Sequence, residues 1–204
     1  MGPGKMLEEC CDLIQSFDAK VMTVDAHAME QLGDTDAEDA APHKVFMQQV
    51  LYGCVRYKKP LRTFLLNFYH DNAGKILRSD YTLFQVLCYL AVFRLRELGF
   101  EQFRRFVSSQ EPGKMHIFLE YLWRPENMAG PIMQDWLTVF DREYIERELW
   151  AGLEGERKSV EELCETLAKK AFGAAKAKTE KEKRDPRELK NRKKQTVPVS
   201  PRIT

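Results

Sequence analysis

The sequence predicts an all-α protein: an irregular multi-helix bundle or short helical-hairpin array with a basic, partly disordered C-terminal tail. Proline and glycine fall at segment ends, and the apolar residues between them recur every three to four positions. No segment shows the strict apolar–polar alternation of a half-buried strand. The 12 phenylalanines, 7 tyrosines and 3 tryptophans supply bulky rings that pack between helices. No repeat of solenoid length stands out, so a true solenoid is the second choice.

Composition divides the chain into an N-terminal helix with an acidic linker (1–41), a helical domain (42–172) and a basic extended tail (173–204). Residues 1–167 carry 19 Lys/Arg against 27 Asp/Glu, whereas residues 168–204 carry 13 against 4. An acidic, apolar-rich body joined to a basic tail is typical of a folded module that carries a binding arm. A binding function is therefore predicted ahead of catalysis.

The first helix is predicted over about residues 5–20, and the acidic stretch 33–41 reads as a solvated linker. Three prolines mark later helix starts, at Pro42, Pro60 and Pro112, because the first turn of a helix accepts proline. The faces predicted to turn inward are Leu7, Cys11, Ile14 and Phe17; Phe46, Val50 and Cys54; Leu61, Phe64, Leu65 and Phe68; and Met115, Phe118, Leu119 and Leu122.

The segment from Tyr81 to Phe93 leaves hardly any polar face, which predicts a buried central helix. Ser79 and Asp80 are N-cap residues before it, and Gly99 is predicted to end it. The next helix turns Phe100, Phe103, Phe106 and Val107 inward and Arg104 and Arg105 outward. Further apolar groups are Ile132, Trp136, Leu137 and Phe140; Tyr144, Ile145 and Leu149; and Val160, Leu163, Cys164 and Leu167.

Motifs that carry chemistry are weak. The segment 72–76 is similar to the end of a phosphate-binding loop, but Tyr69 replaces its first glycine and Ile76 its Ser/Thr, which favours a helix stop and turn. The four histidines lack the spacing of a zinc site. We therefore predict no catalytic residue, no cofactor, no metal and no enzymatic activity; a triad assembled in space is the remaining enzyme hypothesis.

The cysteines and the longest apolar run bear on location. Cys10, Cys11, Cys54, Cys88 and Cys164 are odd in number and irregularly spaced, which indicates reduced, buried thiols of a cytosolic protein. The run 86–93 is far shorter than the roughly 20 residues of a membrane span. We expect no membrane span and no secretion signal.

The basic tail holds the candidate interaction residues. These are Lys176, Lys178, Lys181, Lys183, Arg184, Arg187, Lys190, Arg192, Lys193 and Lys194. Such a run can neutralise the phosphates of nucleic acid or an acidic protein surface such as the outside of a microtubule. Few aromatic residues lie among the lysines, which disfavours single-strand binding by base stacking and makes nucleic acid the weaker hypothesis. A solvated linker is the alternative interpretation.

The segment 77–100, LRSDYTLFQVLCYLAVFRLRELGF, resembles the cilia- and flagella-associated protein 99 family. The similarity covers about residues 45–150, and the shorter pieces that agree with it are Tyr52-Gly-Cys, Lys58-Lys59, Phe68-Tyr69, Lys114-Met115 and Phe118-Leu119. The resemblance implies a helical, non-enzymatic structural subunit of the motile-cilium axoneme, in the central-pair apparatus. Its implied location is the cilium or flagellum, within the cytoskeleton. Its implied partners are axonemal proteins, with tubulin and central-pair projection proteins as candidates, and it implies no small-molecule substrate.

Residues and resemblance together predict two attachments. In the first attachment, the helical body docks on large neighbours through a surface near Arg94, Arg96, Arg104 and Arg105. The alternative interpretation is that these four arginines lie on ordinary solvated helix faces. The tail adds a second attachment, which raises avidity through effective concentration. The alternative function is a basic-tailed adaptor that binds nucleic acid or an acidic membrane surface.

Overall fold

The computed structural model describes residues 2–35, 40–124, 127 and 150–184, and every regular element in this part of the chain is helical. The all-α prediction is therefore confirmed. The elements are α1 (Pro3–Gln15), α2 (Val24–Leu32), α3 (Pro42–Arg56), α4 (Lys58–Asp71), the 3-10 helix η1 (Arg78–Asp80), α5 (Tyr81–Phe93), α6 (Leu95–Leu98), α7 (Phe100–Ser108), α8 (Pro112–Leu122) and α12 (Trp150–Arg184). The helical segments predicted between residues 132 and 149 lie outside the described residues.

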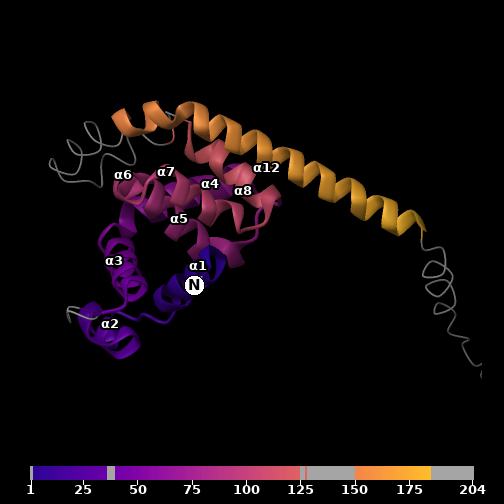
Figure 1. The fold of residues 1–204 in the computed structure, drawn as a ribbon. Coiled ribbons are helices and arrows are strands. Elements are labelled where there is room, and N and C mark those ends of the chain that lie inside the picture. Colours follow the sequence, from indigo (N-terminus) through magenta and orange to yellow (C-terminus); the bar gives the residue numbers. More distant parts are fainter. Residues whose placement is uncertain (1, 36–39, 125–126, 128–149, 185–204) are drawn as a thin grey trace, which may run out of the picture.

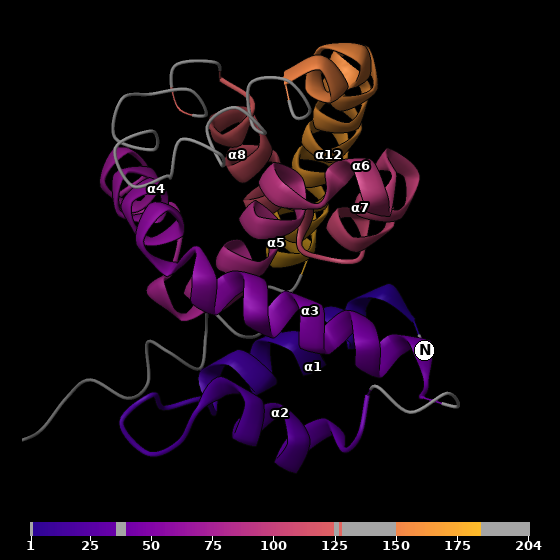
Figure 2. The same ribbon diagram turned by 90° about the vertical axis from the view of Figure 1, so that its left-hand side faces the viewer.

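Helix α5 is the centre of the bundle. Ten of its thirteen residues are buried, on every side of the helix. Helices α1, α3, α4 and α7 pack against it (Figures 1 and 2). One hydrophobic cluster runs from Leu7 in α1 to Leu167 in α12, so the N-terminal helix shares its core with the segment 42–172.

The prolines start helices as predicted. Pro42 and Pro112 are the first residues of α3 and α8, and Pro60 lies in the first turn of α4. After α4, Gly74 adopts φ +79 and Ile76 is buried, so the segment 72–76 is a helix stop and turn. The predicted inward faces of α4, α7 and α8 are all buried, and so are Val50 and Cys54 of α3. Phe46 is half-buried and stacks on Phe106, with ring centroids 5.8 Å apart.

The predicted face of α1 was partly wrong. The helix buries Leu7, Cys10 and Leu13, whereas Cys11 and Ile14 are half-buried at its flank. The helix ends at Gln15, so Phe17 lies beyond it. The reason is that α1 contacts both α3 and α5, and the buried stripe follows the line between these two neighbours rather than the widest apolar arc.

Helix α2 was not predicted, although its start carries a capping signal. The Thr23 hydroxyl accepts a hydrogen bond from the Ala26 N–H at 3.2 Å. Its buried face consists of His27, Ala28 and Leu32, so a histidine and an alanine replace the larger apolar residues that make a helix recognisable. His27 is buried because its Nε2 donates to the Leu13 carbonyl at 3.0 Å, which ties α2 to the end of α1.

The central helix ends earlier than predicted. Helix α5 stops at Phe93, and the short α6 follows before Gly99 adopts φ +76. Arg94 lies between the two helices with φ −129 and ψ 0. Its guanidinium donates to Gln49 of α3 at 3.0 Å and pairs with Glu97 at 2.7 Å, which fixes the break against α3.

Asp80 does not cap α5 with its side chain, contrary to the sequence prediction. Its carboxylate instead pairs with the Lys114 ammonium of α8 at 2.9 Å. Lys114 also lies 3.4 Å from Glu111, and the hydrogen bond to Asp80 is the main cause that raises the pKa of Lys114. This contact orients the N-terminal turn of α8 toward the start of α5.

Phe68 is the hub of the aromatic core. The ring centroids of Tyr69, Phe84, Phe118 and Tyr121 lie between 5.3 and 5.6 Å from its own, all in edge-to-face geometry. Such pairs contribute about 0.5–1.5 kcal/mol each beyond the burial of apolar area. The cluster therefore joins α4, α5 and α8 through one side chain.

Gly53 sets the approach of α3 to α5. A Cβ atom at this position would lie 2.0 Å from Cζ of Tyr89, so only glycine lets the tyrosine ring lie against the α3 backbone. The Tyr89 ring also stacks with Phe93 and Tyr57, at centroid distances of 5.8 and 6.4 Å. A larger residue must displace this ring or separate the two helices.

We expect Gly53→Ala to lower the free energy of unfolding by about 1–2 kcal/mol, because overpacking outweighs the gain in helix propensity. The matched control is Gly113→Ala in α8, where the new methyl group would meet Ala171 Cβ at an ordinary 3.8 Å. Urea denaturation of both variants measures the difference. Equal stabilities for the two variants would contradict the packing argument.

The cysteines are buried or half-buried free thiols. Burial raises the pKa of Cys10 and Cys11 to about 12 and that of Cys164 to about 11. Burial also raises the pKa of Cys54 and Cys88. Because the thiolate is the reactive form, all five should be poor nucleophiles in the folded protein.

We expect alkylation of the native protein at pH 8 to be slow at every cysteine and fastest at Cys164, whose pKa is raised least among those given a value. Its rate should rise with pH toward about 11, since the thiolate fraction grows tenfold per pH unit below the pKa. Mass spectrometry of iodoacetamide-treated protein, with the guanidinium-unfolded chain as control, measures both effects. Rapid labelling of Cys88 in the folded protein would show that α5 is not enclosed.

Candidate functional site

The candidate site is α12, which begins as a packed helix and ends as a projecting one. Val160, Leu163 and Leu167 are buried at helical spacing and form its seat on the body. Helix α8 supplies most of the opposing surface. Leu119 of α8 and Trp123, which directly follows α8, share a groove with Val160 and Cys164. Gly113 lies near Ala171, so the two helices run antiparallel.

Beyond residue 171 the helix leaves the body. Figure 1 shows its C-terminal part extending clear of all other described helices. Phe172 is 76% exposed, the most exposed large apolar side chain in the described residues. The helix continues to Arg184, so the segment 174–184 adds roughly 16 Å of projecting helix at 1.5 Å per residue.

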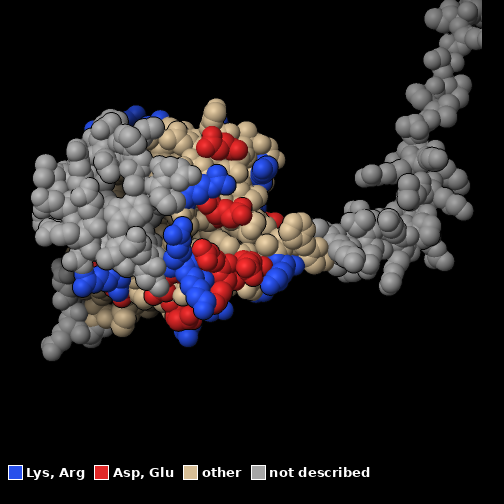
Figure 3. Space-filling model, turned by 90° about the horizontal axis from the view of Figure 1, so that it is seen from above, with Lys and Arg blue, Asp and Glu red and all other residues tan. Residues whose placement is uncertain are grey.

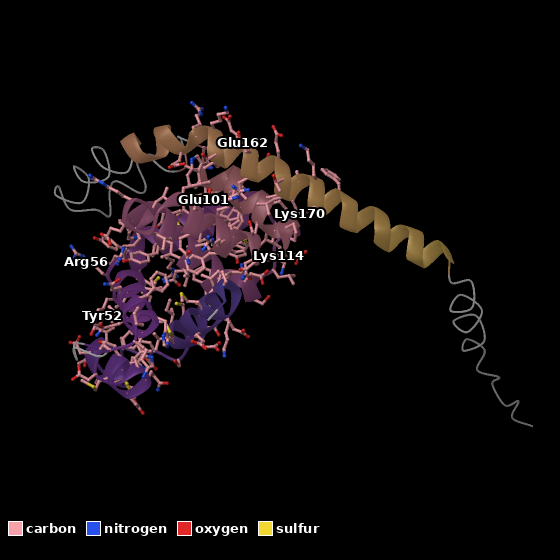
Figure 4. All side chains as sticks on the ribbon, in the orientation of Figure 1. Tyr52, Arg56, Glu101, Lys114, Glu162 and Lys170 are labelled. Atoms are coloured by element: carbon pink, nitrogen blue, oxygen red, sulfur yellow. The ribbon has the colours of Figure 1, made fainter. Side chains whose placement is uncertain are left out.

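The packed part of α12 carries both signs of charge on its solvent side. Arg157 and Glu161 lie 3.7 Å apart, and Glu165 and Lys169 lie 3.5 Å apart, both pairs at i,i+4 spacing. Glu162 is exposed on the outer side of the helix (Figure 4). Seen from above, basic and acidic side chains alternate over the described body (Figure 3). Along α12, a strong excess of positive charge therefore begins only where the helix projects.

Half of the predicted tail residues fall on this helix. Lys176, Lys178, Lys181, Lys183 and Arg184 belong to α12, together with only two acidic residues in the segment 174–184. Arg187, Lys190, Arg192, Lys193 and Lys194 lie outside the described residues. The basic arm is thus helical at its root.

The four body arginines differ in exposure and in contacts. Arg94 is held between Gln49 and Glu97, and only 22% of its side chain is exposed. Arg96 is exposed on α6, and Arg104 and Arg105 are exposed on α7. Arg104 lies 3.5 Å from Glu101. Arg94 therefore has a structural contact of its own, while the other three guanidinium groups lie at the surface.

The histidines lie apart in the fold. His27 is buried under α1, His70 lies 3.1 Å from Asp71 and His116 lies 3.6 Å from Glu120. Within the described part of the chain, no three His, Cys, Asp or Glu side chains gather as metal ligands do. None of the described helices combines the length and apolar character needed to cross a membrane.

One surface feature was missed in the sequence: a groove between α1, α2 and α3 with a volume of about 460 Å³. Glu9 and Asp12 of α1 line one side, and Leu13, Leu32 and Met47 form its apolar part. The excess of acidic residues in the first 41 positions was a visible signal. The groove itself could not be found, because one wall is the unpredicted α2.

Comparisons with known proteins return no relationship: no protein-family model, no curated protein and no solved structure matches this chain. The fold and site define an all-helical protein with a projecting basic helix.

We expect the double variant Leu163→Ala/Leu167→Ala to release α12 from α8, because each truncation removes about 2–5 kcal/mol of core packing from a helix with a narrow buried stripe. Hydrogen exchange should then speed up in α12 while α5 stays protected. The exposed Phe172→Ala change is the control and should leave both helices as they are. Unchanged protection of residues 156–171 in the double variant would contradict this seat.

Proposed function

We propose that this protein is a non-enzymatic structural subunit of the motile-cilium axoneme, in the central-pair apparatus, that anchors through its helical body and its basic C-terminal arm. The observation that carries the proposal is α12: one helix that is fixed to the core at its root and basic where it projects. The resemblance of residues 77–100 to the cilia- and flagella-associated protein 99 family supplies the cellular setting.

The fixed root matters for an anchoring role. Val160, Leu163 and Leu167 attach α12 to the same core that holds α5, so a load on the arm is transmitted to the whole body. A flexible linker would instead let the two parts move independently. A body that docks on one neighbour and a stiff arm that reaches a second are suited to a permanent mechanical assembly.

The charge of the arm selects its partner class. The segment 174–184 contains five Lys/Arg and two acidic residues, and more basic residues follow in the sequence. Such a segment binds an acidic protein surface, of which tubulin is the abundant example in an axoneme. On the body, Arg96, Arg104 and Arg105 are exposed, whereas Arg94 is held in its contact with Gln49, so the proposed docking surface centres on the three exposed arginines.

The test compares the full chain with Lys176→Gln/Lys178→Gln/Lys181→Gln/Lys183→Gln in detergent-extracted motile cilia. We expect wild type to remain with the axoneme and the variant to bind at least tenfold more weakly, since four lost ion pairs of about 0.5 kcal/mol each amount to more than a tenfold change. Replacing the same four residues by arginine keeps the charge and should preserve retention.

The alternative function, a basic-tailed adaptor for nucleic acid or an acidic membrane surface, predicts a different partner for the same residues. Duplex DNA and anionic vesicles are therefore tested beside purified axonemes at the same salt concentration, because all three contacts weaken as salt rises. Absence of the wild-type chain from axonemes, with binding to DNA or vesicles, would replace the proposed function with this alternative.

A further inference from the structure

The chain is charge-polarised along its length in three steps. Residues 1–41 carry 2 Lys/Arg and 10 Asp/Glu, residues 42–167 carry 17 of each, and residues 168–204 carry 13 and 4. The net negative charge of the body thus comes entirely from the N-terminal segment. The described residues of this segment include α1 and α2.

The groove lies in this acidic part. Its volume of about 460 Å³ is within the range of roughly 300–1,000 Å³ that binding clefts have. Leu13, Leu32 and Met47 give it an apolar floor that is itself buried, and Glu9 and Asp12 project from α1 along its edge. An apolar floor beside carboxylates suits a basic amphipathic segment, whose aliphatic stems cover the floor while its ammonium groups reach the acids.

The walls of the groove are held in place by polar contacts. Lys44 donates from its ammonium to the Leu32 carbonyl at 2.8 Å, which fixes the end of α2 to the start of α3. Tyr52 donates to Asp25 at 2.8 Å further along α3 (Figure 4). With His27 bonded to Leu13, α2 is tied to both neighbours, so the groove is formed before anything binds.

The ammonium of Lys44 is committed to the carbonyl end of α2, and His43 is the other basic residue on this wall. Glu9 has a long contact with Lys5, 3.8 Å, in which the lysine is mostly exposed. Exposed pairs of this kind contribute little and exchange readily. The α1 side of the groove therefore offers its carboxylates to an incoming cation.

We propose that this groove receives the basic end of α12 from a second copy of the chain, which gives a head-to-tail contact. The inference rests on the proposed role of α12 as a docking arm and names one partner for it. The net charges of the two segments are opposite: residues 1–41 carry −8, and residues 168–184 at the end of α12 carry 7 Lys/Arg against 2 Asp/Glu, a net charge of +5. Charge complementarity of this size steers and aligns protein association.

The geometry favours a second copy over the same molecule. Helix α12 lies on the opposite side of the body from α2, and its projecting part leads away from the groove (Figures 1 and 2). A continuous helix cannot turn back without a break, so the helical part of the arm, up to Arg184, does not reach the groove of its own chain. Because arm and groove are different surfaces, the contact is heterologous and can extend beyond a dimer.

The test is sedimentation velocity of the purified full chain over a range of concentrations at low and high salt. The groove variant is Glu9→Lys/Asp12→Lys, and the arm variant carries Lys→Glu at 176, 178, 181 and 183. The control is Glu101→Lys/Glu162→Lys, which makes the same charge change at exposed sites on α7 and α12 (Figure 4). Circular dichroism and thermal unfolding verify that each variant folds.

We expect wild type and the control to self-associate at low salt, and the groove and arm variants to associate at least tenfold more weakly. An equimolar mixture of groove and arm variants should associate again, because lysines in one groove meet glutamates on the other arm. A wild-type chain that stays monomeric at every concentration, or a groove variant that associates like the control, would overturn the proposal.

The same variants separate this inference from the proposed function. The groove variant keeps its arm intact, so its retention in extracted axonemes reports on the axonemal role alone. Self-association without axonemal retention removes the proposed function and leaves the head-to-tail contact. Axonemal retention of a wild-type chain that stays monomeric removes the head-to-tail contact and leaves the proposed function.

Discussion

The fold depends on one constraint: α5 has no polar side. A helix that buries ten of thirteen residues must be covered all round, because any side left in water would expose aliphatic and aromatic groups. Helices α1, α3, α4 and α7 supply this cover, although α1 and α7 are separated in sequence by the whole segment 16–99. Gly53 allows α3 to approach closely, and Phe68 joins α4 to both α5 and α8. The short α6 follows from the same constraint, since Arg94 at the end of α5 reaches back to Gln49 of α3.

The division into body and arm follows from where the apolar residues stop. Helix α12 has a buried stripe of Val160, Leu163 and Leu167, enough to hold one side of it on α8. The next positions along this line are alanines, and the large residue that follows Leu167, Phe172, is turned to solvent. Past this point nothing in the sequence can bury the helix against the body, so it projects. The arm is thus a consequence of composition as well as a candidate binding element.

The sequence predicted those features that depend on local chemistry. Prolines at helix starts, the all-round apolar segment that became α5 and the inward phenylalanines of α4, α7 and α8 were all recognisable, because each rests on spacing or on a single residue type. Features that depend on a distant partner were not recognisable. His27 can be a core residue because the Leu13 carbonyl accepts a hydrogen bond from its ring N–H. The Asp80 side chain pairs with Lys114, 34 positions away, instead of capping α5. The groove has one feature of each kind: its acidic residues could be seen in the sequence, whereas helix α2, which forms one of its walls, was not predicted.

The chain carries opposite net charges at its two ends, and the packing of the core does not require this separation of charge. The middle of the chain, residues 42–167, is electrically balanced and contains most of the core, so neither end charge is needed to hold the bundle together. Like charges gathered in one segment repel each other, and this cost persists unless an opposite surface compensates it. The fold places the acidic α1–α2 region and the basic end of α12 on opposite sides of the body, where they cannot neutralise each other through the helical part of the arm. In the proposed head-to-tail contact, the helical part of the arm is compensated by the groove of another molecule, and a chain with a complementary charge at each end can be both donor and acceptor of the same contact.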